Sequence, residues 1–231
     1  MEPIPEVRAA EIQLAALADE TLDLVQGLTA MSSLAQTLLP SCVGVSITVM
    51  VDGDPFTVTA TSEDINAVDA TQYLDGGPCV EAVAVADQVL VDDVLDEQQW
   101  QLYAQAANAT GIRASMSLPL RGSRDQPVGA LNLYASSPGA FHGKEAQLAE
   151  LFGVHVNELV ANADLSFMTR EFARELPERL AEHEQVNQAV GVLMGLHDWT
   201  AEQARERLNY AAAHARASQA SVARMVMVLD T

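Results

Sequence analysis

The sequence predicts an α+β protein in which an antiparallel sheet flanked by helices is followed by a small all-α domain of three helices. Alternating, β-branched runs recur between residues 42 and 134, as expected for half-buried strands. Only helical spacing of apolar residues is found from residue 178 onward. Charge divides the chain at the same place, since residues 1–177 hold 25 acidic and 7 basic residues and residues 178–231 hold 7 and 5. This asymmetry indicates two modules with different partners.

The elements of the first module follow from changes in apolar spacing. A helix is expected over 6–39, because apolar or small residues recur there at alternate spacings of three and four. Pro40 ends this helix. Strands and helices then follow at 42–51 (strand), 56–60 (strand), 63–74 (helix), 89–91 (strand), 96–109 (helix), 113–120 (strand) and 127–134 (strand), with a loop at 76–83. A further helix is expected from 143 to 176, before Pro177.

The last part of the chain reads as three helices, at about 178–197, 200–215 and 219–229. Thr200 is the expected N-cap of the second helix, and Gln203, three residues on, completes a capping box. So small a module cannot build a large core of its own.

Bulk composition excludes several classes of function. A formal charge of −20 repels phosphate backbones and anionic membranes unless basic residues gather locally. Two cysteines cannot form a disulfide framework, and neither a signal peptide nor a membrane-spanning stretch is found. We therefore expect a cytoplasmic protein with no membrane partner, and we predict no DNA partner.

No catalytic or cofactor motif stands out. The chain has no Gly-rich phosphate loop, nucleophile elbow or HExxH motif, and we expect no enzyme, no metal and no cofactor. The carboxylates Asp92, Asp93, Asp96 and Glu97 could bind a cation, but such residues more often cap the following helix.

The stretch from Val89 to Phe141 resembles the second half of a GAF domain. The landmarks that carry this resemblance are Asp92, Trp100, Gly111, Arg113, Pro119, Leu120, Gly129, Leu131, Asn132, Tyr134 and Phe141. The tract from Gly76 to Val83 is similar to a loop of many actinobacterial GAF regulators. The resemblance covers about residues 20–165 and implies a GAF-type sheet with a sensing role.

The stretch from Glu178 to Val226 resembles an ANTAR domain. Small residues of that family's three-helix signature stand at Ala189, Gly191, Ala204, Ala212 and Ala223, where close helix contacts are expected, and apolar positions match at Val186, Val192, Leu193, Met194, Leu208, Val222 and Val226. The resemblance implies binding to RNA hairpins near transcription terminators, which favours read-through, by a dimer.

The resemblance also defines the expected domain organisation. A helix at 1–40 serves dimerisation or packs on its own sheet, and these two interpretations have equal weight. The GAF sensor domain spans 20–165, a linker helix 144–177, and the ANTAR domain 178–231. We predict a homodimer built on the apolar stripes at 14–38 and 148–167.

Positive charge and stacking groups should carry RNA binding. The candidates are Arg179, Arg205, Arg207, Arg216, Arg224, His183 and Tyr210, with His214 as a further base contact. Arg216 is favoured because it precedes the third helix in a basic, polar stretch. For each arginine the alternative is an exposed helix face paired with glutamate, and for His183 and Tyr210 a structural role is the favoured interpretation.

The sequence departs from the ANTAR pattern at two cationic positions. His183 stands where the family commonly has arginine, and Val190 where it commonly has lysine between Ala189 and Gly191. RNA binding implied by the resemblance is therefore expected to be weak.

A small-molecule pocket is expected between the sheet and the loops that cover it. Its candidate lining is Cys79, Val80, Trp100, Arg113 and Met116; the alternative is that side chains fill this space. We expect Cys79, in a loop near a helix start, to be more reactive than Cys42 in a strand.

Three functions follow in order of preference. The first is a signal-responsive RNA-binding antiterminator controlled by a GAF sensor. The alternative is a ligand-binding or protein-interaction regulator whose ANTAR domain has lost or weakened RNA binding. A GAF-fold thiol oxidoreductase is a distant third.

Overall fold

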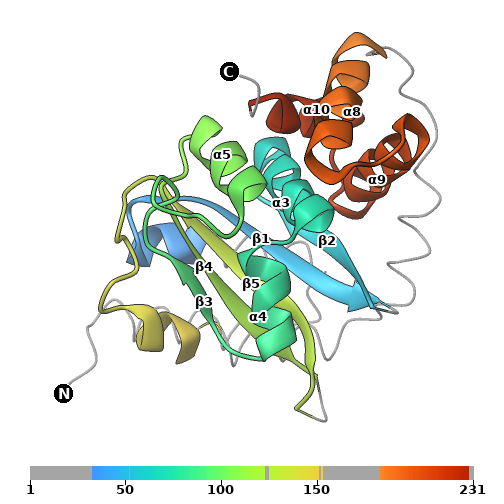
Figure 1. Cartoon of the computed structure of the whole chain (residues 1–231). Helices are drawn as coiled ribbons and strands as arrows, with labels where there is room; N and C mark the ends of the chain where they lie inside the picture. Colours follow the sequence, from blue (N-terminus) through green and yellow to red (C-terminus); the bar gives the residue numbers. More distant parts are fainter. Residues whose placement is uncertain (1–32, 52, 123–124, 151, 153–182, 229–231) are drawn as a thin grey trace.

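The computed structural model describes residues 33–51, 53–122, 125–150, 152 and 183–228 (Figure 1). Its centre is a five-stranded antiparallel sheet in the order β2-β1-β5-β4-β3. The strands are β1 (Cys42–Val51), β2 (Asp54–Ala60), β3 (Val89–Val91), β4 (Ala114–Arg121) and β5 (Pro127–Ala135). The antiparallel sheet expected from the alternating runs is therefore confirmed.

Helices cover one face of this sheet (Figure 1). They are α3 (Glu63–Asp75), α4 (Pro78–Val85) and α5 (Gln101–Ala109). The opposite face is covered by helical residues 33–38 and 145–150, and Leu34, Leu148 and Phe152 share an apolar cluster with the strands. The remainder of the expected N-terminal and linker helices lies outside the described residues.

The two faces of the sheet differ in polarity. Odd-numbered residues of β1, such as Ile47, and even-numbered residues of β4, such as Leu118, join the apolar cluster on the face opposite α3. The alternate positions are polar and still buried: Ser46, Thr48, Ser115, Ser117, Asn132 and Tyr134. Because strand side chains alternate between faces, these polar groups point toward the helices.

Two helices begin where the sequence did not predict them. Helix α4 lies in the expected loop at 76–83, because Pro78 at the first helical position has the right φ and needs no N–H partner. Helix α5 starts at Gln101 rather than 96, because the Glu97 carboxylate accepts hydrogen bonds from the backbone N–H groups of Gln99 and Trp100.

Three helices form the C-terminal domain: α8 (His183–His197), α9 (Ala201–His214) and α10 (Gln219–Met227). Thr200 and Gln203 form the predicted capping box. Helices α9 and α10 pack against α3, and α10 also contacts α5 (Figure 1). The small domain thus completes its core against the helical layer of the sheet domain.

Candidate functional site

The predicted pocket residues do not gather around one space. Cys79 is the second residue of α4 and is fully buried, and its backbone N–H donates to Gln72 Oε1 at 2.8 Å. Met116 belongs to the apolar cluster on the opposite face of the sheet. Val80 and Trp100 are half-buried. The structure therefore separates Met116 from Cys79 by the sheet itself.

The expectation of an accessible loop thiol at Cys79 is wrong. Burial, together with the negative charge of nearby Asp69, raises the pKa of Cys79 to about 12, although hydrogen bonds with Thr48 and Asn132 oppose the shift. Desolvation outweighs any stabilisation of the thiolate by the start of α4. Cys42 is also buried and free, and burial raises its pKa as well.

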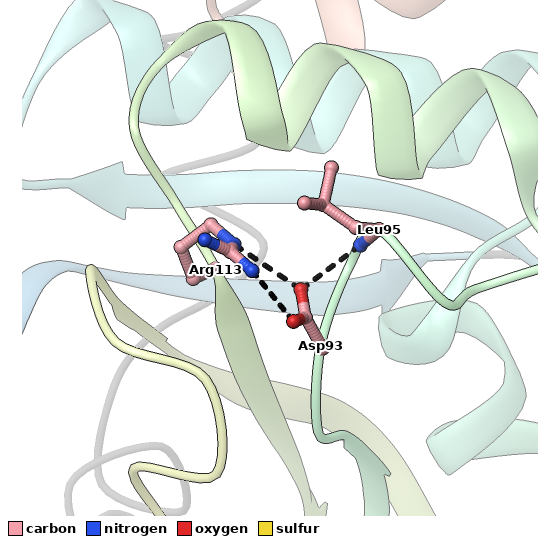
Figure 2. Close-up of polar contacts among 3 residues, drawn as sticks. All are labelled: Asp93, Leu95 and Arg113. Carbon is pink, nitrogen blue, oxygen red and sulfur yellow. Dashed lines mark hydrogen bonds and ion pairs between the residues drawn. The ribbon is translucent and has the colours of Figure 1, made fainter.

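Arg113 forms polar contacts with the loop that follows β3 (Figure 2). Its guanidinium makes a bidentate pair with Asp93, with Nε to Oδ1 at 3.1 Å and Nη2 to Oδ2 at 2.6 Å. The Leu95 backbone N–H donates to the same carboxylate at 3.0 Å. The hydrogen bonds from Arg113 are the main reason that the pKa of Asp93 is lowered. The pair fixes the segment after β3 against the start of β4.

Two of the four carboxylates considered as a cation site have other partners in the structure. Asp93 is paired with arginine, and Glu97 caps backbone N–H groups. Within the described residues no group of three or more His, Cys, Asp or Glu side chains could hold a metal ion.

A buried polar network lies between α3 and the sheet, and the sequence did not predict it. Asp69 on α3 is fully buried and accepts hydrogen bonds from the hydroxyls of Tyr134 and Thr57 and from the Gln72 amide. The Tyr73 hydroxyl joins Thr57 at 2.7 Å. Burial raises the pKa of Asp69 to about 6, although its hydrogen bonds oppose the shift. These side chains hold α3 to the sheet through their own hydrogen bonds.

The C-terminal domain shows the close helix packing that its small residues predicted. Ala189, Ala204, Ala212 and Ala223 are buried in one cluster with Val186, Leu193, Leu208, Val222 and Val226. Gly191 is the exception, because it is exposed and a Cβ there would meet no atom within 4 Å. Met194 is likewise exposed, so these two family positions lie at the surface here.

The predicted RNA-binding residues fall into two groups. Arg205, Arg207 and Arg224 lie at exposed positions; Arg205 donates to Asn187 Oδ1, Arg207 lies over the Trp199 ring, and Arg224 donates to Ser221. His183 is the first residue of α8. Arg179 lies outside the described residues.

A groove of about 280 Å³ adjoins one member of the exposed group, Arg224. Its lining is Gln185, Gln188, Arg224, Met227 and Val228. The two glutamines come from α8, and the other residues from α10 and its end.

The second group contacts the sheet domain. Arg216 Nη1 donates to the Val58 carbonyl at 2.7 Å. The His214 ring stacks on Phe56, with centroids 4.0 Å apart, and on Tyr210 at 3.7 Å. Burial against these rings lowers the pKa of His214.

More contacts along α3 join the two domains. Ser221 Oγ donates to Glu63 Oε1 at 2.7 Å, and the Asn66 amide donates to the Arg216 carbonyl at 3.4 Å. Ala70, Leu74 and Leu102 share the apolar cluster of the C-terminal helices. Sequence reasoning missed this surface, because α3 presents small apolar residues on it rather than a long apolar stripe.

These features define a class: an α+β domain with a buried polar network on one face of its sheet, joined to a three-helix domain that bears exposed arginines. Residues 14–161 match the GAF domain family, and residues 174–227 match the ANTAR domain family. The chain belongs to the GAF domain family and has the GAF-ANTAR architecture of a signal-responsive regulator. No curated protein sequence matches it.

Solved structures share the fold at low sequence identity. The reduced form of fRMsr of Staphylococcus aureus has 16% identity and a TM-score of 0.51, covering 69% of this chain and 99% of that chain. The same protein in complex with its substrate has 16% identity and a TM-score of 0.51, covering 70% of this chain and 99% of that chain. A GAF domain structure has 13% identity and a TM-score of 0.51, covering 66% of this chain and 86% of that chain. None of the helices in the described part of the chain has the length and apolarity needed to cross a membrane.

Proposed function

We propose that this protein is an RNA-binding transcription antiterminator whose GAF domain receives the signal. The observation that carries the proposal is the ANTAR match over residues 174–227, which follows directly on a GAF domain. Exposed Arg205, Arg207 and Arg224 supply the positive charge that RNA binding needs.

A direct test is RNA crosslinking in cells that express the full chain, followed by sequencing of the retained RNA. The proposal expects enrichment of hairpins close to terminators. The control is a triple variant with Arg205→Ala, Arg207→Ala and Arg224→Ala. If the wild-type protein retains no more RNA than this variant does, the proposed function is wrong.

One observation favours the second candidate, an interaction regulator with weak RNA binding. Arg216, the favoured arginine, donates to a carbonyl of the GAF domain, and His214 and Tyr210 lie in the same contact. In this alternative the ANTAR helices serve protein contact. Binding of hairpin RNA by the purified chain at low salt distinguishes the two, because the first candidate expects tight binding and the alternative expects weak binding or none.

We propose no enzymatic role for the two cysteines. Both thiols are buried with raised pKa values, whereas a catalytic thiol needs thiolate character and access. The shared fold with fRMsr, at 16% identity, carries no activity to this chain. Methionine sulfoxide reduction by the purified protein, abolished in a Cys79→Ser variant, would overturn this.

The expected partners follow from the two domains. We propose RNA hairpins and a second copy of the chain as partners, with a small molecule as the signal at the GAF domain. Most of the two predicted dimer stripes lies outside the described residues, so light scattering at micromolar protein is the appropriate test. A monomeric mass over that range would remove the dimer.

A further inference from the structure

The contact between the two domains uses the chemistry with which an RNA would contact the same residues. Three alternate positions of β2 take part. Burial and the nearby Asp54 carboxylate raise the pKa of Tyr210, the Phe56 ring stacks on His214, and the Val58 carbonyl accepts a hydrogen bond from Arg216. A carboxylate, an aromatic ring and an acceptor oxygen thus meet a hydroxyl, an imidazole and a guanidinium.

RNA presents equivalent groups. Phosphate oxygens and base edges accept hydrogen bonds from arginine and tyrosine, and unpaired bases stack on aromatic side chains. Phe56 stacks on His214 with the rings 29° from parallel, as a base would. A base that stacks on this side of His214 must displace Phe56.

The start of α3 extends the same pattern. Glu63 Oε1 accepts from Ser221 Oγ, and Ser221 also accepts from Arg224 at 3.0 Å. A carboxylate therefore lies beside the first turn of α10, on the same hydroxyl to which Arg224 donates. Any phosphate that approaches this edge meets the repulsion of Asp54 and Glu63.

The apolar part of the contact holds the edge in place. Ala70 and Leu74 of α3 pack with the C-terminal helices, and Ala67 packs with Met225 of α10. The same helix carries Asp69 and Gln72 on its inner side, in the buried polar network. A signal that rearranges this network would move α3 and with it the contact.

We propose that β2 and the start of α3 imitate RNA, so that the GAF domain and the hairpin compete for the ANTAR edge formed by Tyr210, His214 and Arg216. This inference rests on the proposed RNA-binding function. It assigns the GAF surface of Asp54, Phe56, Val58 and Glu63 as the competitor, and it makes domain separation the step that permits RNA binding at this edge.

The test uses the full chain and a pool of hairpin RNAs with a fixed stem and a randomised loop. An Asp54→Asn, Phe56→Leu double variant weakens the competitor and leaves every ANTAR residue intact. We expect about tenfold tighter binding, within the usual range of coupling between sites. Asp87→Asn, which makes the same charge change at an exposed position far from the contact, should bind as the wild type does.

Adding Arg216→Ala to the double variant should remove most of the gain. If Arg216→Ala has no effect there, RNA uses another face, such as the groove beside Arg224, and the inference is overturned.

A second experiment crosslinks the two domains so that they cannot separate. Glu63→Cys and Ser221→Cys place two thiols on opposite sides of it, and a short bifunctional thiol reagent should join them within one chain, because Cys42 and Cys79 are buried. We expect the joined protein to bind RNA about tenfold more weakly than the same variant before treatment.

The outcomes separate the two claims. Equal RNA affinity before and after joining, together with no gain in the double variant, overturns competition and leaves RNA binding standing. Absence of RNA binding in every variant, the opened one included, overturns the antiterminator function and the competition with it.

Discussion

Asp69 is a carboxylic acid enclosed by neutral hydrogen-bond donors. Hydroxyls from Thr57 and Tyr134 and the Gln72 amide surround it, and it is fully buried. Removing a carboxylate from water disfavours its charged form, and burial therefore outweighs the donors and raises its pKa to about 6 from 3.8. The folded protein holds this proton at a pH where the unfolded chain has lost it.

This shift makes stability depend on pH in a defined direction. Because the pKa of Asp69 is raised in the folded state, its contribution to the free energy of unfolding is fully present below pH 3.8. This contribution is lost as pH rises through about 6. An Asp69→Asn variant, which cannot titrate, should gain about 2–3 kcal/mol relative to wild type between pH 4 and pH 7. Urea unfolding across this range measures the difference, and parallel curves for the two proteins would contradict it.

Cys79 should resist alkylation in the native protein. It is fully buried with a pKa of about 12, whereas Cys42 is 5% exposed. Since the thiolate is the reacting species, we expect Cys79 to react no faster than Cys42, and both to react readily after unfolding. Competitive alkylation with peptide mapping decides, and a fast native reaction at Cys79 would show that α4 opens.

Sequence alone reached only part of this residue-scale chemistry. The Thr200 capping box was predictable, because it depends on residues three apart in the chain. Asp69 was not, because an aspartate in a helical stretch is ordinarily assigned to the solvent face. Its burial depends on hydroxyls of two strands that the sequence does not place beside it.

At the scale of elements, the register of β1 and β5 leaves no room for a side chain at Gly129. Gly129 pairs with Val49, and a Cβ at this position would lie 2.1 Å from the Thr48 carbonyl oxygen. Gly129→Ala must therefore push the two central strands apart. We expect a loss of about 1–3 kcal/mol in the free energy of unfolding, measured by chemical denaturation.

Gly191 offers the opposite case in helix α8. It is exposed, and a Cβ would meet nothing within 4 Å. Gly191→Ala should stabilise the protein by about 0.5–1 kcal/mol, because alanine favours a helix interior and glycine does not. A destabilising effect of this substitution would indicate a close contact at Gly191 that the structure lacks.

Elements were predictable where one local pattern governs them. The central strands follow from alternation, and Ala189, Ala204, Ala212 and Ala223 lie at helix contacts as expected. Helix α4 was missed because its start, Gly76-Gly77-Pro78, also has the composition of a turn. The pocket prediction was wrong at Met116, because side chains alternate between the faces of a strand and its neighbours Ser115 and Ser117 are the ones that face the helices.

At the scale of the whole molecule, the main feature is the contact between the ANTAR helices and α3. The division of charge in the sequence predicted two modules with different partners. It did not predict that the modules bind each other, since that depends on the shape of two folded surfaces. The contact brings Arg216 to a strand 158 residues away in sequence.

Protonation of His214 should weaken this contact. Burial lowers its pKa below 6.5 in the closed form, although the carboxylate of Asp54 opposes the shift and Phe56 and Tyr210 are neutral at this pH. A lowered pKa means that the contribution of His214 to closure is present above pH 6.5 and is lost as pH falls through the lowered value. The domains should therefore separate as pH falls from about 7.5 to 5.5.

His214→Phe is the matched control, because it keeps the ring stack with Phe56 and Tyr210 but cannot take up a proton. Asp69 titrates in the same range in both proteins, so the difference between them isolates His214. Small-angle scattering across this pH range should show a growing radius of gyration for the wild type and a smaller change for the variant. Equal growth in both would mean that acid opens the molecule through other groups, and an unchanged radius in both would mean that the contact withstands a charged imidazole.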